Sequence, residues 1–172
     1  MKRTILTILG LALTMPLTSM AAPDFSGAWM RDEASSDAGP PELYWLTRGV
    51  DATGGRPPSE AERSLEVAQD GNKLTVTRDR RILSNHLNYM LDGKPHTVAM
   101  MTGMAQATVT ASWKGDTLVI NTVEPFGGMP GNATMQTSEV WSLSADGKVL
   151  TITTTRELPA TTKTIKQVYR RQ

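Results

Sequence analysis

The chain has 172 residues, no cysteine, and 18 basic against 17 acidic side chains. That length suits a single domain with one core, which must fold without disulfide bonds. The near balance of charge gives no electrostatic surface for nucleic acid. No cofactor is predicted.

The N-terminus is predicted to be a secretory signal peptide spanning residues 1–21. Lys2 and Arg3 precede an apolar run at 5–17, which ends in the small residues of "TSMAAP". The run is shorter than the roughly 20 residues of a spanning helix, and no second apolar run follows, so no membrane span is expected. Cleavage before Ala22 would leave residues 22–172 as one domain in the periplasm or outside the cell. Without Lys2 and Arg3 the basic residues fall from 18 to 16 against 17 acidic ones, a formal charge of −1.

The remainder of the chain is typical of antiparallel strands. Asp-Gly pairs, which favour hairpin turns, occur at 70–71, 92–93 and 146–147, and a similar turn is expected at 114–116. Between the turns, apolar residues alternate with Thr and Ser. The predicted strands are 25–31, 64–69, 73–78, 84–91, 95–101, 105–114, 117–123, 135–143, 148–155 and 163–170. The predicted fold class is all-β, an antiparallel up-and-down barrel of about eight to ten strands, with a β-sandwich or another barrel as the alternative.

A long connection follows the first strand. Residues 32–62 are rich in Gly, Pro, Ser and charge, and connections of this length are usually functional or disordered. The segment "PELYWLTRG" contains apolar residues 43–46, which we expect to pack against the barrel as a loop or short helical lid.

The first strand carries a family resemblance. "GAW" (Gly27 to Trp29), followed by hairpins, resembles the G-x-W start of lipocalins and other calycins, and most of the chain is similar to a group of small exported bacterial proteins. The resemblance implies that Trp29 packs across the closed base of the barrel, with Gly27 allowing close backbone approach. It also implies a lid like that of the ten-stranded fatty-acid-binding proteins. Arg170 and Arg171 are candidates for packing over Trp29, whereas no lipocalin-type T-D-Y motif is found.

The segment "PHTVAMMTGMAQ" (95–106) raises the question of a copper site. His96, with Met100, Met101 and Met104, supplies soft ligands, and His86 is expected to face His96 across a hairpin. Strand alternation, however, places Met100 and Met101 on opposite faces. No metal site is therefore predicted, and the methionines, with Met129 and Met135, fit a pliable apolar wall better.

The sequence favours a binding protein over an enzyme, without excluding an enzyme. It lacks the common hydrolase and nucleotide-binding motifs. An acid–base pair would have to combine His86 or His96 with a residue such as Glu124, Glu139 or Tyr89. The basic group Arg78, Arg80 and Arg81 is interpreted mainly as the charged face of an edge strand, and alternatively as an anion-binding group.

The leading hypothesis is an exported protein that holds a small apolar or amphipathic molecule in a barrel cavity. The candidate ligand-binding residues are Tyr44, Trp45, Tyr89, Met100, Trp113 and Trp141. One alternative is a periplasmic interaction or inhibitor module that binds a protein partner through loops 32–62 and 124–134. Another is a cavity enzyme acting on a small hydrophobic substrate.

Overall fold

The computed structural model describes residues 22–37, 63–78, 85–99, 106–125, 133–158 and 161–172. Their regular elements are ten antiparallel strands: β1 (Gly27–Arg31), β2 (Ser64–Asp70), β3 (Lys73–Arg78), β4 (Asn85–Met90), β5 (Pro95–Ala99), β6 (Gln106–Lys114), β7 (Thr117–Pro125), β8 (Thr134–Leu143), β9 (Val149–Leu158) and β10 (Thr161–Arg171). All ten predicted strands are present. The largest difference in bounds is at β9, which continues to Leu158 where the sequence predicted an end at 155.

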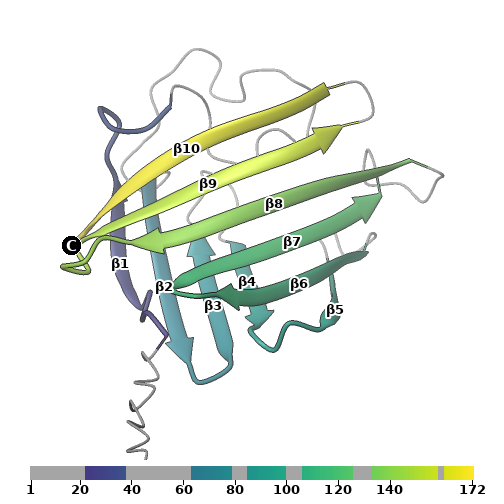
Figure 1. The fold of residues 1–172 in the computed structure, drawn as a ribbon, viewed down its shortest axis with the longest axis horizontal. Helices are drawn as coiled ribbons and strands as arrows, with labels where there is room; N and C mark the ends of the chain where they lie inside the picture. Colours follow the sequence, from purple (N-terminus) through teal and green to yellow (C-terminus); the bar gives the residue numbers. More distant parts are fainter. Residues whose placement is uncertain (1–21, 38–62, 79–84, 100–105, 126–132, 159–160) are drawn as a thin grey trace, which may run out of the picture.

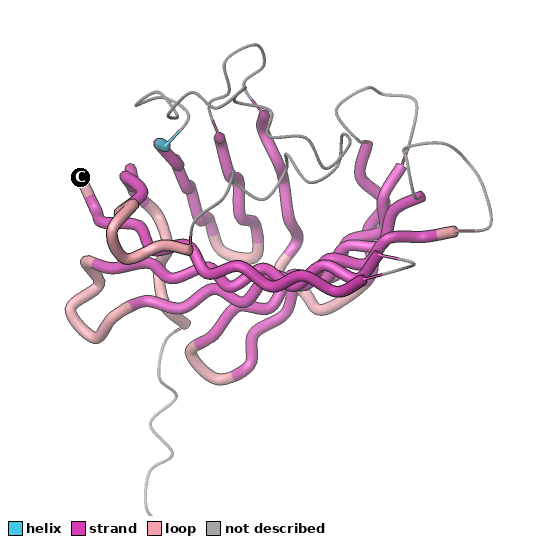
Figure 2. The backbone as a smooth tube through the Cα atoms, turned by 90° about the horizontal axis from the view of Figure 1, so that it is seen from above, coloured by secondary structure: helices cyan, strands magenta, loops and turns pink. Residues whose placement is uncertain are grey.

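The strands form one sheet that bends into a nearly closed barrel (Figures 1 and 2). Its order is β4-β3-β2-β1-β10-β9-β8-β7-β6-β5, so the first strand pairs with the last. Trp29 lies opposite Arg171 in that pairing, and Trp29 also lies opposite Leu65 of β2. The predicted all-β antiparallel barrel is confirmed. The lid predicted at residues 43–46 lies outside the described residues.

One predicted pairing is wrong. β4 and β5 were expected to form a hairpin, with His86 facing His96, but they stand at opposite ends of the strand order. The His86 backbone pairs with Thr77 of β3, and His96 pairs with Val109 of β6. The connection at 91–94 bonds to other elements, since Leu91 N–H donates to Asn72 O (2.7 Å) and Gly93 N–H to Ala111 O (3.0 Å). Asp-Gly therefore turns the chain here without pairing the strands that flank it.

The tight turns after β2, β6 and β8, with the connection at 91–94, lie at one end of the barrel, called here the turn end. Gly71, Gly115 and Gly147 have φ angles of 52°, 62° and 68° in these turns, a region that favours glycine. The other ends of the strands define the loop end. Among the described residues, no helix is long and apolar enough to cross a membrane.

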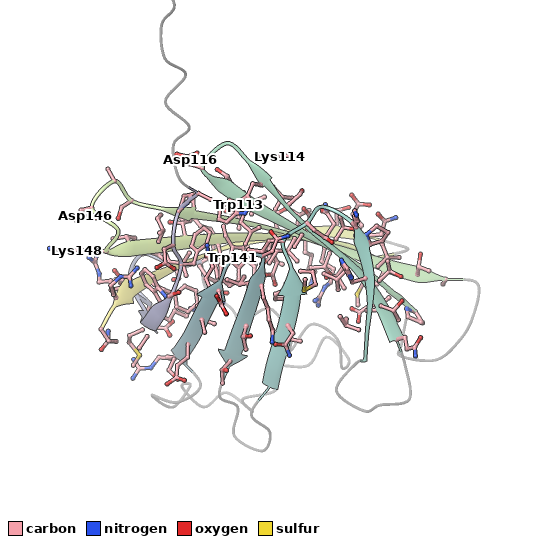
Figure 3. The ribbon with its side chains drawn as sticks, turned by 90° about the horizontal axis from the view of Figure 1, so that it is seen from below. Trp113, Lys114, Asp116, Trp141, Asp146 and Lys148 are labelled. Carbon is pink, nitrogen blue, oxygen red and sulfur yellow. The ribbon has the colours of Figure 1, made fainter. Side chains whose placement is uncertain are left out.

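The turn end is filled by aromatic side chains (Figure 3). Phe25 stacks on Trp113 with ring centroids 5.7 Å apart, and meets Trp141 edge to face at 5.8 Å. Trp29 Nε1 donates to Phe25 O at 3.0 Å. Phe25, Trp29 and Trp141 are each no more than 1% exposed, so this end of the barrel is solid core.

Candidate functional site

The inner face of the barrel changes from apolar to polar along β7, β8, β9 and β10. Near the turn end, the inward positions are apolar, as with Leu118, Trp141 and Ile152. Toward the loop end, the same strands place polar and charged side chains inward. We call these the polar band: Glu124, Thr137, Glu139, Thr154, Arg156 and Gln167, all 8% exposed or less. A buried polar side chain destabilises the folded state unless it is hydrogen-bonded, so the bonding partners of these six side chains are described next.

Strand register brings the polar band together. Glu139 of β8 lies directly opposite Thr154 of β9, and Thr137 lies directly opposite Arg156. Arg156 Nε donates to Thr137 Oγ1 at 3.2 Å. Glu139 Oε2 accepts a hydrogen bond from Trp141 Nε1 at 2.9 Å, which links the band to the aromatic core.

Glu124 is the member of the polar band on β7, and it lies near the loop end of that strand. Burial raises the pKa of its carboxyl group, because the charged form loses its hydration, and the Arg156 guanidinium partly offsets this.

Three members of the band carry a buried polar atom that makes no hydrogen bond among the described residues. These atoms are Thr154 Oγ1, Gln167 Nε2 and the Nη1 atom of Arg156, whose Nε is bonded to Thr137. Thr154 is 4% exposed and Gln167 is 1% exposed. Gln167 is held on its other side, since Tyr169 OH donates to Gln167 Oε1 at 3.1 Å. Thr154 lies opposite Ile165, two residues from Gln167 on β10, so the two side chains are diagonal neighbours on the inner face.

Three of the six predicted ligand-binding residues lie in the described part of the chain. Tyr89 and Trp141 are buried and Trp113 is half-buried, and all three belong to or pack against the same hydrophobic core. Trp113 and Trp141 meet through Phe25 at the turn end. Tyr44, Trp45 and Met100 lie outside the described residues. A role for any of the six in ligand binding stays a prediction.

Of the histidine and methionine side chains considered for a copper site, the described residues include that of His96. His96 Nε2 lies 2.9 Å from Asp92 Oδ1, next to the connection at 91–94. Met135 is buried at the loop end of β8, opposite Glu124. Met100, Met101, Met104 and Met129 lie outside the described residues. Within the described ranges, no group of three or more His, Cys, Asp or Glu side chains is placed to hold a metal ion.

The segments predicted to contact a protein partner, 32–62 and 124–134, are mostly outside the described residues. The described part, 32–37, lies along β10: Asp37 N–H donates to Lys166 O at 2.8 Å, and Lys166 N–H donates to Asp37 Oδ2 at 2.7 Å. This segment therefore continues the contact with β10 as far as Lys166, beyond the residues that pair with β1. Arg80 and Arg81 of the basic group are also outside the described residues.

The sequence contained a signal for the polar band that its interpretation missed. In "TMQTSEVWSL" the period-two alternation puts Thr137 and Glu139 on the same face as Trp141. In "VLTITTTREL" it puts Thr154 and Arg156 on the face of Leu150 and Ile152. If the same period-two alternation is followed beyond the apolar residues of each strand, it predicts that the inner surface becomes polar.

Comparison with known proteins finds similarity in fold and none in sequence. No protein-family model and no curated protein matches the chain. A solved structure described as a REP1-NXSQ fatty acid transporter matches with a TM-score of 0.56 and 12% identity, covering 87% of this chain and 96% of the other. Apo lipid binding protein 8 of Caenorhabditis elegans matches with a TM-score of 0.58 and 11% identity, covering 86% and 95% of the two chains.

The zebrafish ileal bile acid-binding protein, solved with cholic acid, matches with a TM-score of 0.55 and 18% identity, covering 86% of this chain and 98% of that one. Each match spans nearly the whole of the compared protein. At these identities the likeness concerns the fold, and the chain folds as an antiparallel β-barrel similar to those of the compared proteins.

Proposed function

We propose that this chain is an exported binding protein that holds one small amphipathic molecule inside its barrel. The observation that carries the proposal is the polarity gradient of the inner face. A solid apolar core fills the turn end, and the polar band begins next to it on the same strands. Small-molecule sites combine a mainly apolar wall with a few placed polar groups, and this arrangement supplies both.

The fold likeness supports the proposal. The compared structures carry the names of a fatty acid transporter, a lipid binding protein and a bile acid-binding protein. Barrels of this size have room for one small ligand when side chains do not fill the whole interior. Export is proposed on the strength of the N-terminal sequence, where a basic start, an apolar run and small residues succeed one another.

The proposal is tested by titrating the purified chain with a neutral apolar dye, N-phenyl-1-naphthylamine, and following dye and tryptophan emission. Binding is expected at micromolar concentration. Ile165→Trp should weaken it at least fivefold, because this half-buried residue of β10 faces the interior opposite Thr154, and a larger side chain would occupy the ligand's space.

Val140→Trp is the matched control. Val140 is 38% exposed on the outer face of β8, so the same substitution there should leave dye affinity unchanged. Absence of dye binding to the wild-type chain at micromolar concentration would overturn the carrier proposal. Equal weakening by both variants would place the dye outside the barrel.

A further inference from the structure

The outer surface of β6, β7, β8 and β9 carries no charged side chain over its central part, within the described residues of these strands. The four strands lie side by side in the sheet (Figure 1). Residues that alternate with the buried inner positions point outward, and at 136–142 of β8 and 151–155 of β9 these are Gln, Ser, Val or Thr. On β6 and β7 they are Thr108, Thr110, Ser112, Val119, Asn121 and Val123. We call this surface the uncharged face.

The outer surface of β2, β3 and β10 differs from the uncharged face, because its outward positions include Glu66, Asp70, Lys73, Lys166 and Arg170. The charges of the chain are therefore unevenly distributed over the barrel. Two of the three exposed large hydrophobic residues in the described ranges, Val123 and Val140, belong to the uncharged face and are 39% and 38% exposed. The centre of a protein interface is depleted in charged residues, and this surface has that composition.

A second copy of this chain is the partner that fits such a surface. A two-fold dimer places one surface against itself, so a charge near the axis would meet a charge of the same sign. The uncharged face presents no charge there. A partner with an acidic or basic surface would instead bury its charges against groups that offer no counter-charge, which is unfavourable.

The charges at the border of the face are complementary to those of a second copy. Lys114 lies at the turn end of β6, and Glu157 lies near the loop end of β9, at the opposite corner of the face. Both side chains are exposed and outward. A two-fold axis in the plane of the interface, perpendicular to the line from Lys114 to Glu157, brings each Lys114 to the Glu157 of the other copy. Two ion pairs would then form at the border.

The size of the face sets the expected strength of the contact. Four neighbouring strands, with the lengths given above, cover roughly 15–20 Å in each direction. This footprint is at the lower end of the sizes of specific interfaces, so the dimer should be weak, with a dissociation constant of roughly 10–300 μM.

We propose that the uncharged face is the interface of a weak two-fold homodimer, with Lys114 and Glu157 paired across its border. The inward residues of the four strands take no part in this contact, so the interiors of the two barrels stay separate. The proposal therefore does not depend on the carrier function.

Sedimentation equilibrium of the purified chain tests the proposal, at concentrations from about 10 μM to about 1 mM that bracket the expected dissociation constant. Asn121→Arg places a new charge at the centre of the face, since Asn121 is exposed and lies between Thr110 and Ser138 of the neighbouring strands. Two like charges would meet near the axis, and the dimer should weaken at least about tenfold. Ser138→Arg should act in the same direction.

Ala68→Arg is the matched control. Ala68 is exposed on the outward side of β2, away from the uncharged face, so the same new charge should leave the dissociation constant within about twofold of wild type. Lys114→Glu should weaken the dimer about 3- to 10-fold, because two anions would meet at each border pair. The charge swap, which combines Lys114→Glu with Glu157→Lys, should restore it. Circular dichroism and the urea midpoint of each variant verify folding.

A wild-type chain that stays monomeric at about 1 mM overturns the proposal. The proposal also fails if the folded Asn121→Arg and Ser138→Arg variants dimerise as the wild type does, or if Ala68→Arg weakens the dimer equally, since either result places the interface elsewhere. If the charge swap does not restore the dimer, the pairing of Lys114 with Glu157 is wrong, and the direction of the two-fold axis with it.

Discussion

Trp29 and Arg171 join the first and last strands at the turn end. The Arg171 guanidinium carbon lies 4.3 Å from the centroid of the Trp29 ring, and Arg171 Nε donates to Gly147 O at 2.9 Å. Of the two arginines considered from the sequence, Arg171 is the one over the indole, while Arg170 forms an exposed ion pair with Asp32. A guanidinium over a tryptophan face contributes about 0.5–2 kcal/mol, and the buried indole contributes far more.

Trp29→Ala should lower the free energy of unfolding by about 3–5 kcal/mol, because a large aromatic side chain that is 1% exposed leaves a cavity. Urea denaturation followed by circular dichroism measures the change. A loss below about 1 kcal/mol would show that Trp29 does not hold the base of the barrel.

Gly27 permits the approach of Arg171 to Trp29. Its φ is +139°, and a Cβ atom there would lie 2.6 Å from Arg171 Nη1. Gly27→Ala should therefore cost about 1–3 kcal/mol, from backbone strain and the displaced guanidinium. In an Arg171→Ala background the same substitution should cost less, since only the strain remains. An equal cost in both backgrounds would exclude the contact with Arg171 as a cause.

Glu124 should make stability depend on pH. Burial raises its folded pKa above the ordinary value of 4.5, so the folded state holds the proton more tightly than the unfolded state. Its contribution is most favourable below pH 4.5 and falls as the pH rises from there through the raised folded pKa. Urea midpoints of wild type and Glu124→Gln should therefore have a constant difference at low pH, with wild type losing stability relative to the variant above it. A difference that stays constant from pH 4 to 8 would contradict the raised pKa.

At the scale of elements, the strands differ in how much backbone pairing holds them in the barrel. β9 pairs with β8 and β10 over most of its length. Among the residues that the structure describes, β4 pairs only with β3, and β5 only with β6 through five residue pairs. The seam between β4 and β5 is bridged at the turn end by the bonds of Leu91 and Gly93.

Native-state hydrogen exchange should reflect this difference. Backbone amides of β5 should exchange faster than those of β9, because β5 has fewer ladder bonds and one edge that pairs with no other described strand. Mass spectrometry of peptides covering 95–99 and 149–158 gives the comparison. Equal protection of the two strands would mean that the seam is closed in solution by contacts beyond the described residues.

At the scale of the whole molecule, we predict that the chain is exported and that its leader is removed by cleavage before Ala22. The first described residues after the predicted leader are held at the turn end, where Gln69 Nε2 donates to Pro23 O at 3.1 Å and Phe25 N–H donates to Gln69 Oε1 at 3.2 Å. Cleavage before Ala22 would leave these contacts intact. Intact-mass measurement on protein recovered from the periplasm or medium should give a chain that begins at Ala22, and a form that retains residues 5–17 would contradict the prediction.

Sequence by itself determined the strands, the turns and the barrel class, because these depend on local chemistry. Period-two alternation defines a half-buried strand, and Gly71, Gly115 and Gly147 supply the positive φ angles that tight turns require. The packing of Trp29 at the base of the barrel could be predicted from the G-x-W resemblance. That motif joins a glycine, which allows close backbone approach, to a large aromatic residue two positions later on the same strand face.

Only the tertiary structure decided which strands pair and which polar residues meet. Asp92-Gly93 has the same local chemistry as the other turns, yet β4 and β5 separate there, because pairing between β1 and β10 places the seam of the barrel between β4 and β5. Glu139, Thr154 and Gln167 lie on three different strands, and their proximity depends on the register of β8, β9 and β10. Register across several strands is a property of the closed sheet, and no single segment of the sequence encodes it.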